Sequence, residues 1–139
     1  MKKLLTFCLL VATAFNVNAQ TFEETVKYIN EKISCCSDYK DEHISCSIDG
    51  DIKWYSAGKD HRINLFDLLP EDQNLTYVVF NSNGIIIYDY TSSFYVRFKI
   101  SGETETLNIF PVQADAERVC KALLHLKSVC TKRNDPFDK

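Results

Sequence analysis

Glycine and proline are scarce in this chain, with 4 and 3 residues among 139, and no repeat or low-complexity stretch interrupts it. Such a composition excludes collagen-like and largely disordered proteins, and we expect a flexible tail only over 132–139. After the N-terminal segment, no stretch approaches the roughly 20 apolar residues that a membrane helix needs. We therefore expect no integral membrane segment.

Basic residues are also in short supply, at 16 against 19 acidic ones. Two of them, Lys2 and Lys3, precede the apolar run 4–15, and 17–19 offer small or apolar residues at the two positions that a signal peptidase recognises. This pattern predicts a signal peptide that is removed before Gln20.

A signal peptide at 1–19 directs the protein out of the cytoplasm. We therefore expect the mature protein to be exported, either to the periplasm or as a secreted protein. Cys8 follows Thr6-Phe7 rather than small residues, so we do not expect a lipoprotein. The remaining residues, about 120 in number, suffice for one domain, which we place at 20–131. About 14 basic side chains then face 19 acidic ones, a balance that repels phosphate backbones, so we expect no nucleic acid partner.

Five cysteines remain after cleavage, namely Cys35, Cys36, Cys46, Cys120 and Cys130. In an oxidising compartment they allow two disulfides and one unpaired thiol, and spacing alone does not select the pairing. The disulfide candidates are Cys36, Cys46, Cys120 and Cys130. A bridge from Cys36 to either Cys46 or Cys130 would tie down the loop after the first helix, and the shorter closure would contribute about 2 to 3 kcal/mol.

Helical periodicity marks both ends of the mature chain. Thr21 and Glu24 have the spacing of a capping box, which predicts a helix from the next residue. Its apolar stripe consists of Phe22, Val26, Ile29 and Ile33. A second stripe, formed by Val119, Leu123, Leu126 and Cys130, predicts an amphipathic C-terminal helix.

Between these helices the pattern alternates with the period of β-strands. A hairpin turning at Asp49-Gly50 is followed by a run over 62–68 and by two further hairpins. The predicted strand pairs of those hairpins are 75–80 with 85–90, and 94–100 with 105–110. We expect an α+β domain with an N-terminal helix, about seven antiparallel strands in a bent barrel or sandwich, and a C-terminal capping helix.

This order of strands and final helix resembles the pleckstrin-homology-like (PH-like) fold, with a helix added at the N-terminus. The segment from Ala116 to Lys127, with its continuation to Asp135-Pro136-Phe137, is similar to the end of small exported bacterial proteins of that type. The resemblance implies a domain that binds a partner. Two features depart from it: the single tryptophan, Trp54, is on a strand rather than in the last helix, and the first hairpin lacks the basic residues of phosphoinositide binders. We therefore do not expect phosphoinositide binding.

One group of residues suggests an enzyme or a metal site as the alternative. Cys35, Cys36, His43 and Cys46 fall within twelve residues and carry groups that bind zinc or supply a cysteine nucleophile with a histidine base. However, adjacent cysteines do not reproduce the usual paired ligand spacing, and no third group is present to orient a base. We therefore expect no catalytic residues, no metal and no cofactor.

Aromatic residues provide the favoured hypothesis. Trp54, Tyr90, Phe94 and Tyr95 are on strands or next to the connection between them, where alternation turns about half of the rings outward. Outward aromatic rings commonly anchor a protein or peptide, whereas inward ones pack in the core. We interpret the protein as a binding module without catalytic activity that recognises a protein or peptide partner.

Overall fold

The computed structural model describes residues 21–70 and 76–132. The predicted signal peptide 1–19 and most of the predicted tail, 133–139, lie outside the described residues. The helices and strands are, in order, α2 (Phe22–Cys36), β1 (Ser45–Cys46), β2 (Asp51–Ser56), β3 (Lys59–Asn64), the 3-10 helix η1 (Leu65–Asp67), β4 (Val78–Ser82), β5 (Ile85–Tyr90), β6 (Ser93–Ile100), β7 (Glu103–Phe110) and α3 (Gln113–Val129).

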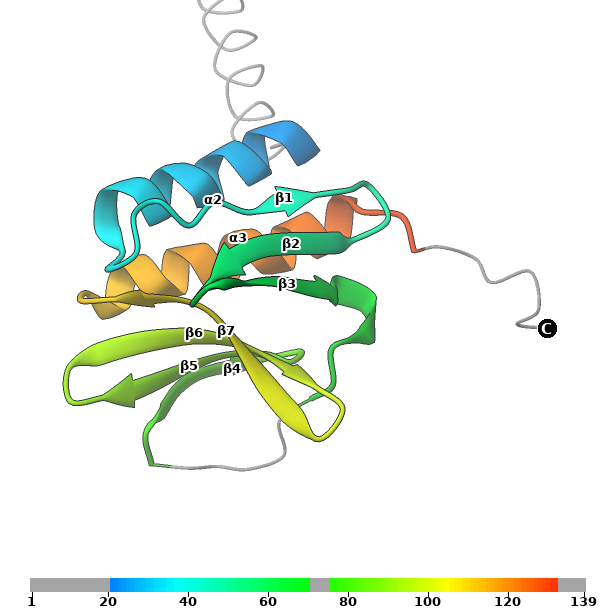
Figure 1. Ribbon diagram of the computed structural model, residues 1–139. Helices are drawn as coiled ribbons and strands as arrows, with labels where there is room; N and C mark the ends of the chain where they lie inside the picture. The colour runs from blue at the N-terminus through cyan, green and yellow to red at the C-terminus, as the bar shows by residue number, and fades with distance from the viewer. Residues whose placement is uncertain (1–20, 71–75, 133–139) are drawn as a thin grey trace, which may run out of the picture.

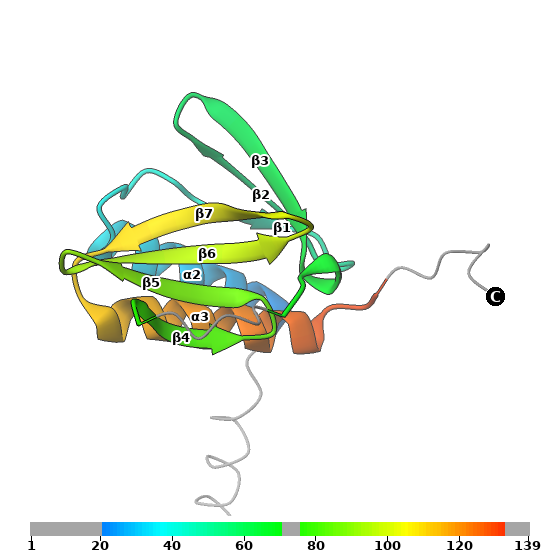
Figure 2. The same ribbon diagram turned by 90° about the horizontal axis from the view of Figure 1, so that it is seen from below.

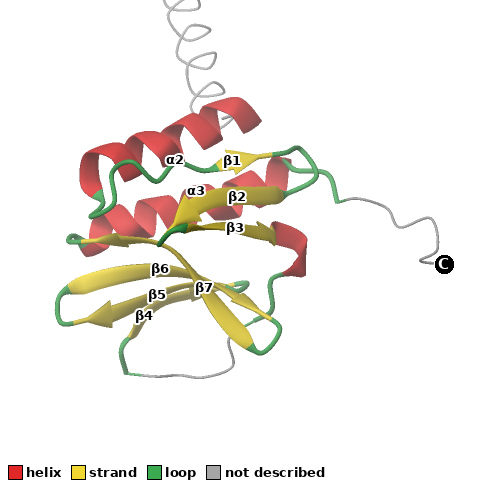
Figure 3. Cartoon of the chain, in the orientation of Figure 1, coloured by secondary structure: helices red, strands yellow, loops and turns green. Residues whose placement is uncertain are grey.

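The strands form two antiparallel sheets, ordered β1-β2-β3 and β4-β5-β6-β7 (Figure 3). The predicted α+β class and the helices at both ends are therefore confirmed. Within the described residues no strand pairing joins the two sheets, so the strands do not close into a barrel. The β2–β3 hairpin instead projects at an angle from the larger sheet (Figure 2).

Both helices lie on one side of the four-stranded sheet, as Figures 1 and 2 show from two directions. The predicted stripe of α3 is buried, since Val119, Leu123 and Leu126 have no exposed surface. This stripe packs against β5, β6 and β7, and α3 also packs along α2, so the ridge meets a helix as well as the sheet. None of the helices within the described residues is long and apolar enough to cross a membrane.

The start of α2 is fixed by the predicted capping box. The backbone nitrogen of Glu24 donates to Oγ1 of Thr21 at 3.2 Å, and the Thr21 nitrogen donates to the Glu24 carboxylate at 2.9 Å. Two backbone donors that have no partner within the helix are thereby satisfied. The predicted stripe then buries Ile29 and Ile33 completely, and Phe22 and Val26 partly.

The limits predicted for the third strand, 62–68, are wrong. β3 begins at Lys59 and ends at Asn64, where the Asn64 side chain accepts a hydrogen bond from the Phe66 nitrogen at 2.9 Å and starts the 3-10 turn. The local asparagine cap therefore ends the strand before the apolar residues Leu65, Phe66 and Leu68. Their hydrophobic character reflects burial of the turn, because Leu65 and Leu68 belong to the core.

Candidate functional site

The two faces of the four-stranded sheet differ in chemistry. On β5, Ile85 and Ile87 point into the core, as do Val96 and Phe98 on β6. Because side chains alternate along a strand, the residues between them belong to the opposite face, which is turned away from the helices (Figure 2). That outer face carries Tyr88 and Tyr90 from β5, and Tyr95 and Arg97 from β6.

Four tyrosine rings cluster on this outer face. Tyr88 and Tyr95 are directly opposite each other on β5 and β6. The Tyr88 and Tyr90 rings are nearly parallel, with centroids 5.9 Å apart, and Tyr95 meets Tyr90 edge-on at 5.3 Å. Tyr77, just before β4, stacks on Tyr90 at 5.5 Å. Mutual ring packing of this kind holds each ring in place before any partner arrives.

Arg97 lies at the centre of the ring cluster. Its guanidinium carbon is 5.0 Å from the centroid of Tyr88, 5.4 Å from that of Tyr95 and 5.8 Å from that of Tyr90. Within residues 21–70 and 76–132 no carboxylate forms an ion pair with Arg97, and its Nε is buried without a hydrogen-bond acceptor. We call Tyr77, Tyr88, Tyr90, Tyr95 and Arg97 together the tyrosine–Arg97 face.

The structure brings together two of the four residues predicted to bind a partner. Tyr90 is 40% exposed and Tyr95 is half-buried beside it. Phe94 lies on the core side of β6, packed against the buried cluster. Trp54 is only 3% exposed, because alternation along β2 turns Ile52 and Trp54 inward, so it is not part of an exposed binding surface.

Sequence reasoning missed Tyr77 and Arg97, and it did not include Tyr88 among the four binding residues. The usable signal was the alternation itself: Tyr88 and Tyr90 are two residues apart on one strand, and Tyr95 and Arg97 are two apart on the next. The predicted strands 85–90 and 94–100 leave 91–93 as their connection, but only Thr91 and Ser92 form it, both with positive φ. A two-residue turn of this hand matches the strand twist and fixes the register that places Tyr88 beside Tyr95.

Trp54 instead belongs to a polar contact between the two sheets. Its ring stacks on the His61 imidazole, with centroids 5.1 Å apart and an interplanar angle of 8°. The His61 Nδ1 lies 2.9 Å from a carboxylate oxygen of Glu105 on β7, and its Nε2 lies 3.2 Å from the Ser56 carbonyl oxygen. His61 therefore has partners at both nitrogens and serves to join β3 to β7 rather than to act as a base.

A groove of about 730 Å³ runs along the three-stranded sheet. Its lining includes His43, Lys53, Trp54, Tyr55 and Arg62. Tyr55, on the outer side of β2, is 60% exposed. This groove is another surface on which an aromatic ring is available to a partner, and it lies on the other sheet from the tyrosine–Arg97 face.

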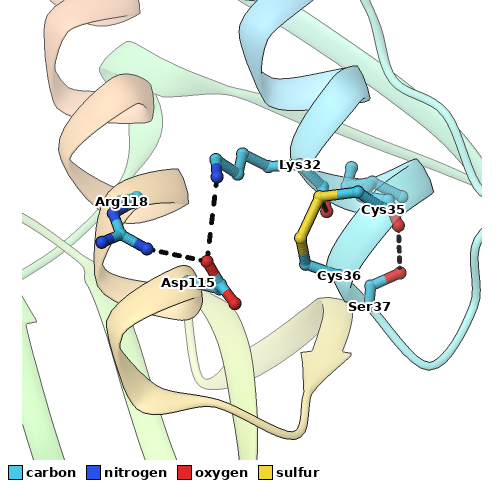
Figure 4. Close-up of a disulfide and its surroundings, with 7 residues drawn as sticks. Lys32, Cys35, Cys36, Ser37, Asp115 and Arg118 are labelled. Atoms are coloured by element: carbon cyan, nitrogen blue, oxygen red, sulfur yellow. Dashed lines mark hydrogen bonds and ion pairs between the residues drawn. A yellow bond between two sulfur atoms is a disulfide. The ribbon is translucent and has the colours of Figure 1, made fainter.

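The residues of the alternative metal or enzyme centre, Cys35, Cys36, His43 and Cys46, are not arranged around one point. Cys35 and Cys36 are joined to each other by a disulfide at the end of α2 (Figure 4), and His43 Nε2 is 2.7 Å from Oγ of Ser34. Cys46 lies elsewhere, with its Sγ 3.3 Å from the Ser47 carbonyl oxygen. Across the described part of the chain, no group of three or more histidine, cysteine, aspartate or glutamate residues is placed to hold a metal ion.

The observed pairing of Cys36 corrects both predicted alternatives, Cys46 and Cys130. A bridge between neighbouring residues closes no loop, so it adds little of the chain-entropy stabilisation expected of the predicted bridges. Near this disulfide, Asp115 of α3 bonds Arg118 at 2.9 Å and lies 3.8 Å from the Lys32 amine of α2 (Figure 4). The ion pair to Lys32 connects the two helices.

Three cysteines are free thiols: Cys46, Cys120 and Cys130. Burial, together with the nearby Cys130 thiol, raises the pKa of Cys46 to about 12. Burial also raises the pKa of Cys130, while a hydrogen bond with Cys46 lowers it. Cys120 is fully buried in the core, which raises its pKa strongly. None of the three is an activated thiolate of the kind a catalytic cysteine requires.

Comparison with known protein families, with curated proteins and with solved structures gives no match for this chain, so the functional evidence comes from the tyrosine–Arg97 face itself.

Proposed function

We propose that this protein is an exported, non-catalytic binding module that holds an acidic protein or peptide segment against the tyrosine–Arg97 face. The observation that carries the proposal is Arg97, a cation surrounded by three tyrosine rings with no carboxylate partner in the described part of the chain. Tyrosine and arginine are the residues that most often dominate the energetics of protein interfaces, which supports a protein or peptide as the partner.

The choice of an acidic segment follows from the chemistry of the guanidinium group. Its planar set of N–H donors matches the two oxygens of a carboxylate, and flanking rings restrict the side chain to one orientation before binding. Little conformational entropy then remains to be lost on binding, which favours affinity. The full chain has a net charge of −3, so the complementarity to an acidic segment is local to Arg97 and is not a property of the whole surface.

The proposal includes a PH-like domain. Antiparallel strands followed by a C-terminal helix that covers the larger sheet support it. The N-terminal helix α2 and the division into sheets of three and four strands are departures from that pattern. The fold alone does not identify a ligand, since function depends on the site that a fold carries.

Peptide selection tests the proposed function. Purified protein is immobilised and used to select from a phage-displayed library of random peptides, and we expect the selected peptides to be enriched in glutamate and aspartate. A selected peptide is then synthesised with glutamate and with the neutral analogue glutamine. Both are titrated against the wild-type protein and Arg97→Gln.

The four affinities form a double-mutant cycle. We expect each single change to weaken binding by roughly tenfold or more, and the two changes together to cost little more than either alone, because both remove the same contact. The proposal would be contradicted if the two losses of affinity added independently. It would also be contradicted if the selection gave peptides without acidic residues or gave no peptide at all.

A further inference from the structure

The end of α3 and the turn after β1 lie against each other, although they are far apart in the sequence. The Thr131 backbone nitrogen donates to the Ile48 carbonyl oxygen at 2.8 Å. On either side of this bond, two thiols approach the same backbone oxygen. Sγ of Cys46 is 3.3 Å from the Ser47 carbonyl oxygen, and Sγ of Cys130 is 4.0 Å from it.

The two thiols are also close enough to affect each other's ionisation, since the Cys130 thiol is among the groups that raise the pKa of Cys46. Both side chains are half-buried, and Cys130 is held at the C-cap of α3 by a hydrogen bond from its backbone nitrogen to the Leu126 carbonyl oxygen at 3.1 Å. Both sulfurs lie within 4.0 Å of one backbone oxygen, so they are neighbours in the folded protein.

We infer that Cys46 and Cys130 form a disulfide that fastens the β1–β2 turn to the end of α3. The reaction requires a disulfide oxidant, such as oxidised glutathione or a thiol oxidase of the exporting compartment. One thiolate attacks the oxidant and releases its first sulfur, and the second cysteine then attacks the mixed disulfide and releases the other sulfur. One disulfide forms, one breaks, and the two protons end on the two thiols of the reduced oxidant.

This pairing accounts for all five cysteines of the predicted mature chain. Cys35 and Cys36 are joined to each other, Cys46 pairs with Cys130, and Cys120 remains as the single thiol. Cys120 has no exposed surface and is on the buried side of α3, where it packs as a small apolar residue and is inaccessible to an oxidant. The odd number of cysteines therefore leaves no reactive thiol on the surface.

The bridge closes a loop over 46–130, which contains β2 to β7 and the whole of α3. A crosslink between residues so far apart in the sequence removes much of the freedom of the unfolded chain, which is the main source of stabilisation by disulfides. For a domain of this size, we expect the crosslink to raise the melting temperature by on the order of 10 °C.

The test begins with the wild-type protein, refolded with oxidised and reduced glutathione and digested without reduction. Mass spectrometry is expected to find one peptide pair that joins Cys46 to Cys130, together with a free Cys120. A bridge from Cys36 to either Cys46 or Cys130, or free thiols at both Cys46 and Cys130, would overturn the inference.

Serine variants supply a second measurement. Cys46→Ser, Cys130→Ser and the double variant are expected to lose the same amount of thermal stability under oxidising conditions, because each removes the one crosslink. The matched control is Cys35→Ser, which leaves the crosslink intact and should keep the oxidised melting temperature. With reductant present, the differences between wild type and the Cys46 and Cys130 variants should largely disappear. Losses that add in the double variant, or that persist unchanged in reductant, contradict the inference.

Discussion

The guanidinium carbon of Arg97 lies 5.0 Å from the centre of the Tyr88 ring, on the face of the sheet that the helices leave uncovered. Tyr88 itself is only 6% exposed, so the contact lies largely out of water, where a cation–π interaction is stronger than at an exposed site. The geometry presents a positive charge in a fixed position with rings around it. The first two predictions concern this arrangement.

Two replacements of Arg97 should show how much of the peptide affinity depends on its positive charge and how much on its planar set of donors. Arg97→Lys keeps the positive charge but loses the planar donor set, so we expect it to bind the selected acidic peptide with an affinity between those of wild type and Arg97→Gln. Isothermal titration calorimetry measures the three affinities. A matched control is Arg62→Gln, which removes an exposed arginine from the other sheet and should leave peptide affinity within about twofold. Equal loss in both glutamine variants would point to a general charge effect.

Tyr90 and Tyr55 provide a comparison between the two sheets. Both are exposed tyrosines on strands, at 40% and 60%, but only Tyr90 belongs to the tyrosine–Arg97 face. We expect Tyr90→Ser to weaken peptide binding by roughly tenfold and Tyr55→Ser to leave it nearly unchanged, because an anchor ring contributes far more than a ring outside the interface. The reverse order would place the site in the groove beside β2.

Gly84 should tolerate alanine less well than Gly58, although both have positive φ in hairpin turns. A Cβ at Gly84 would lie 2.6 Å from the Leu69 carbonyl oxygen and 2.9 Å from Cβ of Leu68, whereas a Cβ at Gly58 would meet nothing within 4 Å. We expect Gly58→Ala to cost about 1 kcal/mol for its dihedral angles and Gly84→Ala about 1 to 3 kcal/mol more. Urea unfolding followed by the fluorescence of Trp54, the single tryptophan, measures both costs, and equal costs would contradict the observed packing.

The pH dependence of stability should reflect the raised pKa values of the Cys46 and Cys130 thiols. The pKa of Cys46 rises from about 9 to about 12 in the folded protein. Between these values the unfolded chain has lost a proton that the folded protein keeps, so stability is fully present below pH 9 and falls as the pH rises toward 12. The pKa of Cys130 is also raised in the folded protein, so its titration lowers stability at high pH as well.

Oxidation provides the control for this pH effect. A Cys46–Cys130 crosslink removes both titrating groups, so the oxidised protein should lose less stability between pH 8 and pH 10.5 than the reduced protein. Urea unfolding of both forms measures the difference, in which the contributions of lysine and tyrosine cancel. Parallel loss in the two forms would show that these thiols do not titrate as the structure indicates.

Much of the fold was predictable because its signals are local. The capping box at Thr21 and Glu24 fixes the start of α2, and the apolar stripe of α3 marks the residues that the core buries. The limits of β3 were missed because Leu65, Phe66 and Leu68 are apolar in a turn that is buried, and burial rather than strand structure selects them. The sequence left a bent barrel and a sandwich as alternatives, because pairing between distant strands leaves no local signal in one sequence.

Only two residues of the tyrosine–Arg97 face, Tyr90 and Tyr95, were predicted from the sequence. Alternation identified Tyr90 and Tyr95 as residues of a potential surface, but it did not indicate which face of β6 meets the helices, and so Phe94 was included and Arg97 was not. Cysteine pairing was beyond sequence reasoning for the same reason, since Cys46 and Cys130 meet only because α3 runs back along the sheet to the first hairpin.

Nuclear magnetic resonance mapping tests the central claim most directly. Isotope-labelled protein is titrated with the selected acidic peptide, and the shifted backbone amides are located. We expect the largest shifts in β5 and β6 around Tyr88, Tyr90, Tyr95 and Arg97, with little change in the β2–β3 hairpin. Shifts confined to that hairpin, with β5 and β6 unaffected, would contradict the assignment of the tyrosine–Arg97 face as the binding site.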